Sequence, residues 1–301
     1  DIEAHGGSVR CGVTIRRILI TAGRASGIEV AGGEQIHTEG FVASGLNPQQ
    51  TFLQLLPESE TAAELRSKAA GFKYNLLAPL FGVHLVTNEP PSYSAAAASP
   101  ELEQAFMTII GLESLEQFHQ IVDAHERGTY PPTVAWGANP TVFDPGQASD
   151  GRHTSFMWEK LPYHLKNDPK TWLTERDRHG DELQQFWSQF APNVAGDNVI
   201  DQFSLSPLDT EESLPNMAEG DLLIGSFANG QIGCNRPFPG AGNYRTPLPG
   251  LYLCGGPTHP GGNITGLCGY NAARVIAADA GKPVWWNPRD IESHLADLAG
   301  A

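Results

Sequence analysis

The sequence lacks long apolar runs and metal-binding patterns. No stretch reaches the roughly 18 apolar residues typical of a membrane-spanning helix. The closest candidate, residues 75–86, is interrupted by Pro79 and His84. The four cysteines form no C-x-x-C pair or other metal-ligand spacing, and no HExxH, P-loop or Gly-x-Ser-x-Gly motif occurs. We therefore expect no transmembrane segment, no metal centre, and free thiols in a reducing compartment.

Positive charge is also scarce in this chain. Lysine and arginine total 19 against 34 aspartates and glutamates, which gives a formal net charge of -15 over 301 residues. Such an acidic balance argues against nucleic acid and anionic membrane surfaces as partners. The length suffices for two domains, and a hydrophobic content of 40% is that of an ordinary globular protein. We expect a cytoplasmic protein, with peripheral association to membranes left open.

Residue patterns divide the chain into three regions and a tail. Residues 1–47 contain short β-prone runs that predict an antiparallel meander, at 9–13, 15–21, 26–30 and 35–43. Residues 48–220 alternate Pro-rich stretches with helical periodicity at 61–70, 114–127 and 177–190. Residues 221–281 predict strands at 221–226 and 251–254, followed by a helix from about 267 to 280. Residues 282–301 form an amphipathic tail to which the sequence assigns no role.

Aromatic residues are dense in the middle region. They are Phe143, Phe156, Trp158, Tyr163, Trp172, Phe186, Trp187 and Phe190. For most of them we expect packing in a hydrophobic core. The alternative is that some of them form a wall around an apolar ligand.

The most informative segment is the glycine-rich run from Gly250 to Gly266. It predicts a short buried strand, a loop with many glycines and the start of a helix. Such an arrangement brings backbone N–H groups and the positive end of a helix dipole to an anionic or electron-rich ligand.

The chain resembles the phytoene desaturase-like branch of the FAD-dependent oxidoreductases, which is related more distantly to the amine oxidases. The strings that carry the resemblance are Gly6-Gly7, Ile15-Arg16-Arg17-Ile18, Gly23–Ile28, Val42–Pro48, Asp144-Pro145, Gly151-Arg152-His153, Ser206–Asp209, Arg236–Gly240, Tyr244–Pro247 and Gly250–Arg274. The last string is the most specific. Together they cover nearly the whole chain.

The resemblance implies a set of residues that bind FAD. In such enzymes the backbone at Ile15 touches the adenine, and Ser44 and Gly45 lie next to the cofactor. The turn at Gly255-Gly256 lets backbone approach the ribityl-pyrophosphate stretch, which requires residues without a Cβ. The loop beneath the isoalloxazine matches Gly262, Asn263, Ile264, Thr265 and Gly266.

The resemblance also implies a reaction. A hydride would leave a substrate carbon for flavin N5, while peptide N–H groups and the helix dipole stabilise negative charge at N1 and O2. His259 could orient substrate or flavin, or could instead hydrogen-bond backbone and hold the loop. Tyr244 is a second catalytic candidate. Arg245 could meet a phosphate or carboxylate, or could form a structural ion pair.

One family motif is missing from the sequence. Family members begin with a strand, a Gly-x-Gly-x-x-Gly turn and a helix that bind the FAD pyrophosphate, and no such motif occurs in these 301 residues. The chain aligns with the second half of the family pattern. It could be a fragment, one subunit of a split enzyme, or a chain numbered after a break. A split or cleaved enzyme is our expectation, with a partner that supplies the nucleotide-binding half.

The expected fold is α/β with α+β character, as the C-terminal part of a two-domain FAD-binding flavoenzyme. Residues 1–47 and 221–281 would belong to the FAD-binding domain and residues 48–220 to an inserted substrate domain. The expected function is FAD-dependent dehydrogenation or desaturation of a mostly apolar substrate. Carotenoids, terpenoids, amines and other hydrophobic molecules stay open, as do oxygen, a quinone or a carrier protein as electron acceptor. The alternative is a non-catalytic structural or regulatory subunit that retains the fold.

Overall fold

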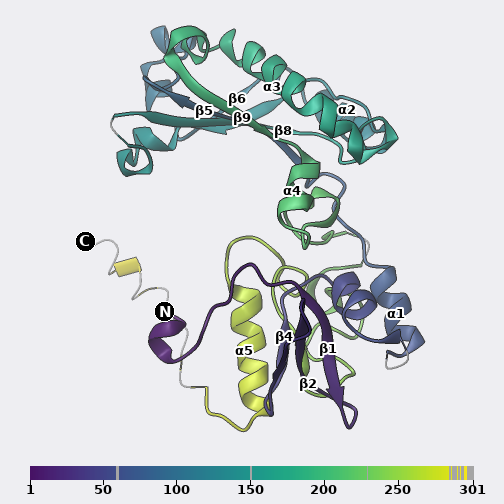
Figure 1. Ribbon diagram of the computed structural model, residues 1–301. Coiled ribbons are helices and arrows are strands. Elements are labelled where there is room, and N and C mark those ends of the chain that lie inside the picture. Colours follow the sequence, from purple (N-terminus) through teal and green to yellow (C-terminus); the bar gives the residue numbers. More distant parts are fainter. Residues whose placement is uncertain are drawn as a thin grey trace. The chain divides into compact units, whose positions relative to one another are not determined.

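The computed structural model describes residues 1–58, 61–149, 151–228 and 230–284, with Trp286, Asp290, Glu292, Leu295 and Ala296 beyond them. The chain divides into two compact units (Figure 1). The first unit comprises Asp1–Phe72 and Phe227–Ala301, and the second comprises Lys73–Ser226. The second unit is thus an insertion in the sequence of the first. The assignment of these parts to cofactor and substrate stays a prediction, and most of the tail 282–301 lies outside the described residues.

The first unit begins with the predicted meander. Strands β1 (Ile15–Thr21), β2 (Arg24–Val30) and β3 (Gln35–His37) form a three-stranded antiparallel sheet. Glycine at position 23 has a φ of 72°, which suits the tight β1–β2 turn. The predicted run 35–43 is split, because its last part forms a separate strand, β4 (Val42–Ser44).

A strand predicted at residues 9–13 is absent, so that prediction was wrong. The segment is exposed throughout and pairs with no strand in the described structure. It is tied to the meander through a side chain instead, because Arg10 donates two hydrogen bonds of 2.9 Å to Glu34. Apolar β-branched residues favour a strand only where a neighbouring strand and a buried face are available.

A parallel strand pair lies at the centre of the first unit. Strand β10 (Leu251–Leu253) pairs with β4 in parallel, so that Leu253 lies opposite Ser44. Helices α1 (Ala63–Ala70) and α5 (Leu267–Asp279) belong to this unit, together with a short π-helix at Gln50–Gln54. The core contains Ile18, Ala25, Phe52, Leu55, Leu56, Leu65, Ala69, Phe238, Ala241, Leu251 and Leu253.

The second unit is built on a five-stranded antiparallel sheet in the order β6-β7-β8-β5-β9. The strands are β5 (Leu80–Thr87), β6 (Met107–Ile110), β7 (Ala135–Ala138), β8 (His153–Lys160) and β9 (Val199–Leu205). The helices are α2 (Glu116–Arg127), α3 (Trp172–Ser188) and α4 (Pro207–Ser213). Helix α3 runs along one face of the sheet (Figure 1). Many core side chains lie between them, including Phe81, Val83, Leu85, Met157, Trp172, Leu183 and Trp187.

The helices predicted in the middle region are present, with shifted starts, whereas the strand predicted at 221–226 is not. Helix α2 starts two residues inside the predicted range, and α3 begins at Trp172, five residues before the predicted start. The strand predicted at 221–226 is wrong, because this segment is a series of turns. Asp221 is fully buried and accepts hydrogen bonds of 2.8 Å from the amides of Asn75, Leu223 and Gly225. An aspartate that satisfies nearby amides in this way favours a turn over a strand.

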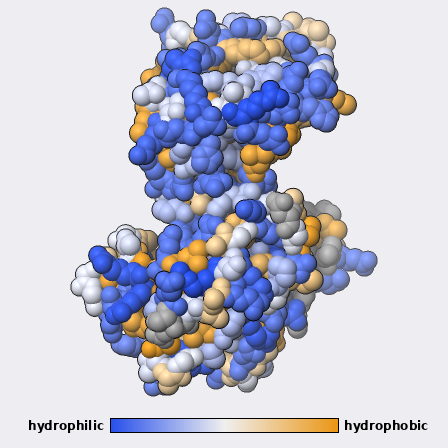
Figure 2. Space-filling model, turned by 90° about the vertical axis from the view of Figure 1, so that its right-hand side faces the viewer, coloured by the Kyte–Doolittle hydropathy of each residue, from blue (hydrophilic) through white to orange (hydrophobic). Residues whose placement is uncertain are grey.

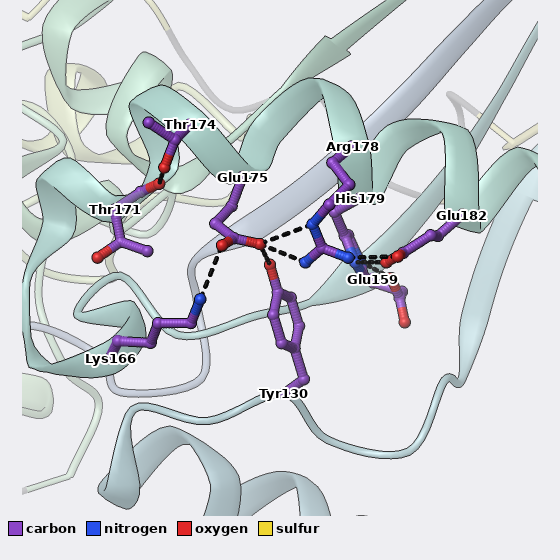
Figure 3. Close-up of polar contacts among 9 residues, drawn as sticks. All are labelled: Tyr130, Glu159, Lys166, Thr171, Thr174, Glu175, Arg178, His179 and Glu182. Carbon is purple, nitrogen blue, oxygen red and sulfur yellow. Dashed lines mark hydrogen bonds and ion pairs between the residues drawn. The ribbon is translucent and has the colours of Figure 1, made fainter.

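The polar side of α3 carries an ion-pair network (Figure 3). Glu175 accepts a 2.7 Å bond from Lys166 Nζ and contacts Arg178, which also bonds Glu182. These bonds, first that of Lys166 and then those of Arg178, lower the pKa of Glu175 to about 2. On the buried side, His179 Nε2 lies 2.7 Å from a carboxylate oxygen of Glu159 on β8. Helix α3 is therefore attached to the sheet by a buried polar pair as well as by apolar packing.

Candidate functional site

The carboxyl ends of β4 and β10 meet at one edge of the parallel pair. The amide of Cys254 donates a 2.7 Å bond to the carbonyl of Ser44, where both strands end. Gly255 follows with a φ of 84°. A Cβ at that position would lie 2.8 Å from the carbonyl oxygen of Gly45. The two segments therefore approach each other backbone to backbone, as the carboxyl edge of a ligand-binding parallel sheet requires.

Hydrogen bonds to its backbone carbonyls hold the loop that follows β10. Both the amide and the hydroxyl of Thr258 donate to the carbonyl of Gly255, at 3.0 and 2.8 Å. The hydroxyl of Tyr244 donates to the carbonyl of His259 at 2.9 Å. The buried thiol of Cys268, on α5, lies 3.4 Å from the carbonyl of Thr258. The path of the loop is thus determined by side chains from three different segments.

Arg236 is a further anchor of this loop. It is fully buried, and its Nη2 donates to the carbonyl of Gly256 at 3.0 Å. Its guanidinium also bonds the carbonyl of Gln231 and lies 4.4 Å from the centre of the Phe227 ring. The planar guanidinium suits this position because it can donate to two carbonyls while its face packs on a ring.

The last part of the loop is exposed where α5 begins. Residues 263–267 are all exposed, and Gly266, with a φ of 69°, stands at the N-cap with no atom within 4 Å of where its Cβ would be. No side chain caps α5 at this position. The amide of Leu267 donates to the hydroxyl of Thr265 at 3.3 Å, but the next amides of the first turn keep hydrogen-bonding capacity for a ligand. The helix dipole favours negative charge there.

The structure brings four of the predicted cofactor residues, Ser44, Gly45, Gly255 and Gly256, to this one edge. Ser44 ends β4 and Gly45 follows it, and Gly255 and Gly256 come after β10 with Cys254 between. Gly262, Asn263, Ile264, Thr265 and Gly266 form the loop that leads into α5. Ile15 lies in the separate meander, at the first position of β1, where its side chain is 38% exposed.

The two catalytic candidates differ in their surroundings. Tyr244 is 6% exposed, burial raises the pKa of its phenol, and its hydroxyl is engaged by the carbonyl of His259. The side chain of His259 is exposed. Tyr244 therefore positions the loop backbone, and catalytic roles for both residues stay predictions. Arg245 forms a bidentate ion pair with Asp279, at 2.7 and 2.8 Å. Of the two roles expected for Arg245, the observed contact is the structural ion pair.

Sequence reasoning did not identify two of the anchors. Arg236 belongs to one of the strings that carry the resemblance, but nothing in the string indicates that its guanidinium is buried. Cys268 lies in the most specific string, but its carbonyl partner cannot be deduced from the sequence. A pocket of about 420 Å³ lies near the amino end of β10, lined by Arg24, Phe41, Tyr252 and Asp279 among others. It is therefore not at the edge where the predicted cofactor residues gather.

Within the described part of the chain, no helix is long and apolar enough to cross a membrane. The same residues include no cluster of three or more His, Cys, Asp or Glu side chains placed to hold a metal ion.

Comparisons with known proteins connect this geometry to a class. No protein-family model matches the chain. It is 28% identical over 294 residues to a limonene dehydrogenase subunit of Castellaniella defragrans, a match that covers 92% of this chain and 52% of that protein. It is 27% identical over 289 residues to hydroxyneurosporene desaturase of Cereibacter sphaeroides, covering 92% and 50%. A putrescine oxidase bound to putrescine shares the fold with a TM-score of 0.52 at 12% identity, over 92% of this chain and 51% of that one.

The fold is thus mixed α/β, as predicted, and it is shared with about half of putrescine oxidase. In sequence, the chain is similar to a limonene dehydrogenase subunit and to carotenoid desaturases, at 22–28% identity. The chain spans about half the length of the curated relatives it matches.

Proposed function

We propose that the chain forms the flavin-end and substrate-binding parts of an FAD-dependent dehydrogenase or desaturase. The observation that carries this proposal is the edge where Gly45 and Gly255 meet backbone to backbone, together with the start of α5, where Gly266 provides no side-chain cap. The relatedness to a limonene dehydrogenase subunit and to carotenoid desaturases supports the reaction class.

The residues at this edge fit a flavin. Gly255 admits no side chain, whereas the space around Gly266 is open. We assign the ribityl-pyrophosphate stretch to Gly255 and Gly256 with Ser44 and Gly45, and the isoalloxazine to the loop 262–266. When bound, FAD supplies a two-electron acceptor for hydride from the substrate. The chain's own contribution is to stabilise the resulting negative charge with the amides and dipole at the start of α5.

A second polypeptide segment or subunit would complete the cofactor site. We infer that it carries the Gly-x-Gly-x-x-Gly turn that this sequence lacks. In the described structure β4 pairs only with β10, which leaves its other edge available to a further parallel strand. The relative from Castellaniella defragrans is named as one subunit of a limonene dehydrogenase, which agrees with an enzyme assembled from more than one chain.

His259 and Tyr244 have different roles in this proposal. We propose that the exposed imidazole of His259 faces the bound substrate or flavin. Tyr244 holds the backbone of His259 through its 2.9 Å hydrogen bond. Hydride removal from a carbon of an apolar substrate needs no strong protein base, so the exposed histidine would act in orientation.

The test is reconstitution of the assembled enzyme. The 301-residue chain is purified alone and together with a polypeptide that carries the motif from a relative or from its natural partner. We expect a yellow complex with bound FAD, and little flavin on the chain alone. The variant Gly262→Val should remove FAD from the complex without changing the circular dichroism of the chain. A folded complex that stays colourless would refute the proposal, and a yellow complex that cannot reduce any acceptor would favour the non-catalytic alternative.

A further inference from the structure

One face of the sheet in the second unit carries aromatic side chains instead of a packed core. Successive residues of a strand point to opposite faces. On β5, Val83 and Leu85 are buried against α3, so His84 between them belongs to the opposite face. On β9, Phe203 lies directly across from His84 and is 53% exposed. Ile109 of β6, which is on the same face as its pairing partner Trp136, is 63% exposed.

Five rings on this face form a continuous group, here called the aromatic surface. They are Trp136, Trp158, Phe156, His84 and Phe203. The ring of His84 stacks on that of Phe203 with centres 4.7 Å apart and planes within 4°, and it lies 6.0 Å from that of Phe156. The ring of Trp158 lies 4.3 Å from Phe156 and 6.5 Å from Trp136. The rings come from the four neighbouring strands β7, β8, β5 and β9, which span about 14 Å at the usual strand spacing.

A glycine makes this arrangement possible. Gly82 lies opposite Trp158 in the strand pairing, and a Cβ at Gly82 would come within 2.8 Å of the Trp158 ring. The indole therefore extends over β5. Burial lowers the pKa of His84, which favours its neutral ring as an apolar surface at neutral pH. The surface thus offers π faces and little charge of its own.

A cation stands at one end of the aromatic surface. Lys160, two residues after Trp158 on β8, places its Nζ 5.5 Å from the centre of the Trp136 ring. Burial lowers the pKa of Lys160, and the charge of Asp221 opposes that shift. Among the residues that the structure describes, none forms an ion pair or a hydrogen bond with this ammonium. The ammonium is therefore available to an anionic group of a ligand.

Figure 2 shows that, on the side it presents, apolar side chains reach the surface in separate patches among hydrophilic ones. The aromatic surface differs from scattered apolar residues, because its rings contact one another and a cation stands beside them. Flat rings with one cation suit a small molecule better than a protein chain, which would need hydrogen-bond partners for its backbone.

We propose that the aromatic surface and Lys160 bind an elongated small molecule with an unsaturated or aromatic body and one anionic end. This inference rests on the proposed function in one respect, which is that the ligand is the enzyme's substrate. If so, the substrate is an unsaturated acid, with its hydrocarbon part against Trp158, Phe156 and Phe203 and its anionic end at Lys160.

The experiment compares two dyes that differ by one charge. The anion 8-anilinonaphthalene-1-sulfonate and the neutral N-phenyl-1-naphthylamine are titrated into the 301-residue chain, and their fluorescence gives the dissociation constants. We expect Lys160→Met to weaken binding of the anionic dye about fivefold and to leave the neutral dye unchanged. The matched control Lys170→Met changes an exposed lysine outside the surface and should leave both dyes unaffected.

Removal of a ring tests the location. Phe203→Ala should weaken both dyes about tenfold, because it removes part of the shared apolar contact. Phe118→Ala, which truncates a phenylalanine of α2 with a similar exposure of 49%, should not. Circular dichroism checks that each variant is folded, and Phe203→Leu replaces Phe203→Ala if needed.

Equal effects of Lys160→Met on both dyes, or unchanged binding in a folded Phe203 variant, would overturn the inference. The outcome is distinguishable from that of the proposed function, because flavin content does not enter the dye titrations. Dye results as expected with a colourless reconstituted complex would refute the flavoenzyme proposal and leave the binding surface standing.

Discussion

The contact between Gly45 and Gly255 leads to a quantitative prediction. In Gly255→Ala, two effects of the new Cβ lower the free energy of unfolding. The first is the left-handed backbone at a φ of 84°, which costs an alanine about 1–2 kcal/mol relative to glycine. The second is the 2.8 Å approach to the carbonyl oxygen of Gly45, which is backbone and cannot rotate away. Together we expect a loss of about 3 kcal/mol in the free energy of unfolding of the first unit.

The variant Gly266→Ala separates these two costs. Gly266 has a similar φ of 69°, but a Cβ there meets no atom within 4 Å. It should therefore lose only the backbone part, about 1 kcal/mol. Urea denaturation followed by far-UV circular dichroism measures both, and the midpoint should fall by about 1 M for Gly255→Ala and by about a third of that for Gly266→Ala. Equal losses in the two variants would show that β4 and β10 do not approach as closely as described here.

Three further predictions concern buried and charged side chains. In Arg236→Lys, the ammonium cannot donate to two carbonyls and pack on a ring at once. The variant should lose about 2 kcal/mol in the free energy of unfolding of the first unit, measured by urea denaturation, and the refolding yield checks that unfolding is reversible. Glu159→Gln removes the charge that faces His179, and should cost the second unit about 1–3 kcal/mol, whereas no change would refute a buried pair. The carboxyl of Glu175 has a folded pKa of about 2 against a reference of 4.5, so its contribution to stability is present above pH 4.5 and is lost as the pH falls toward 2. Lys166→Met should flatten that part of the profile of thermal midpoint against pH.

Local patterns accounted for much of the fold. The run 15–21 matches β1 residue for residue, because a concentration of β-branched side chains and the turn at Gly23 are features of adjacent residues. The helix after Gly266 was also predicted from local signals, with its stop near Gly281. The failures at 9–13 and 221–226 have the opposite cause. Each run has β-prone residues, but one has no neighbouring strand in the described structure and the other begins with a buried aspartate that accepts hydrogen bonds from nearby amides.

In the candidate site, too, some features could be predicted from adjacent residues and others could not. The string from Gly250 to Gly266 indicates a ligand loop by itself, since a concentration of glycines has few other physical uses. The roles of Arg236 and Tyr244 could not be deduced in this way, because their partners, Gly256 and His259, are 15 to 20 residues away in sequence.

The sequence by itself determined the β-meander and the glycine loop, because these depend on backbone conformations that adjacent residues specify. Only the tertiary structure decided which side chains hold that loop, and that Trp158, His84 and Phe203 share one face beside Lys160. Core packing is the expectation from sequence for most aromatic residues of the middle region, and it holds for Trp172 and Trp187. Which face of the sheet each ring occupies follows from strand pairing between distant segments, and no local pattern encodes it.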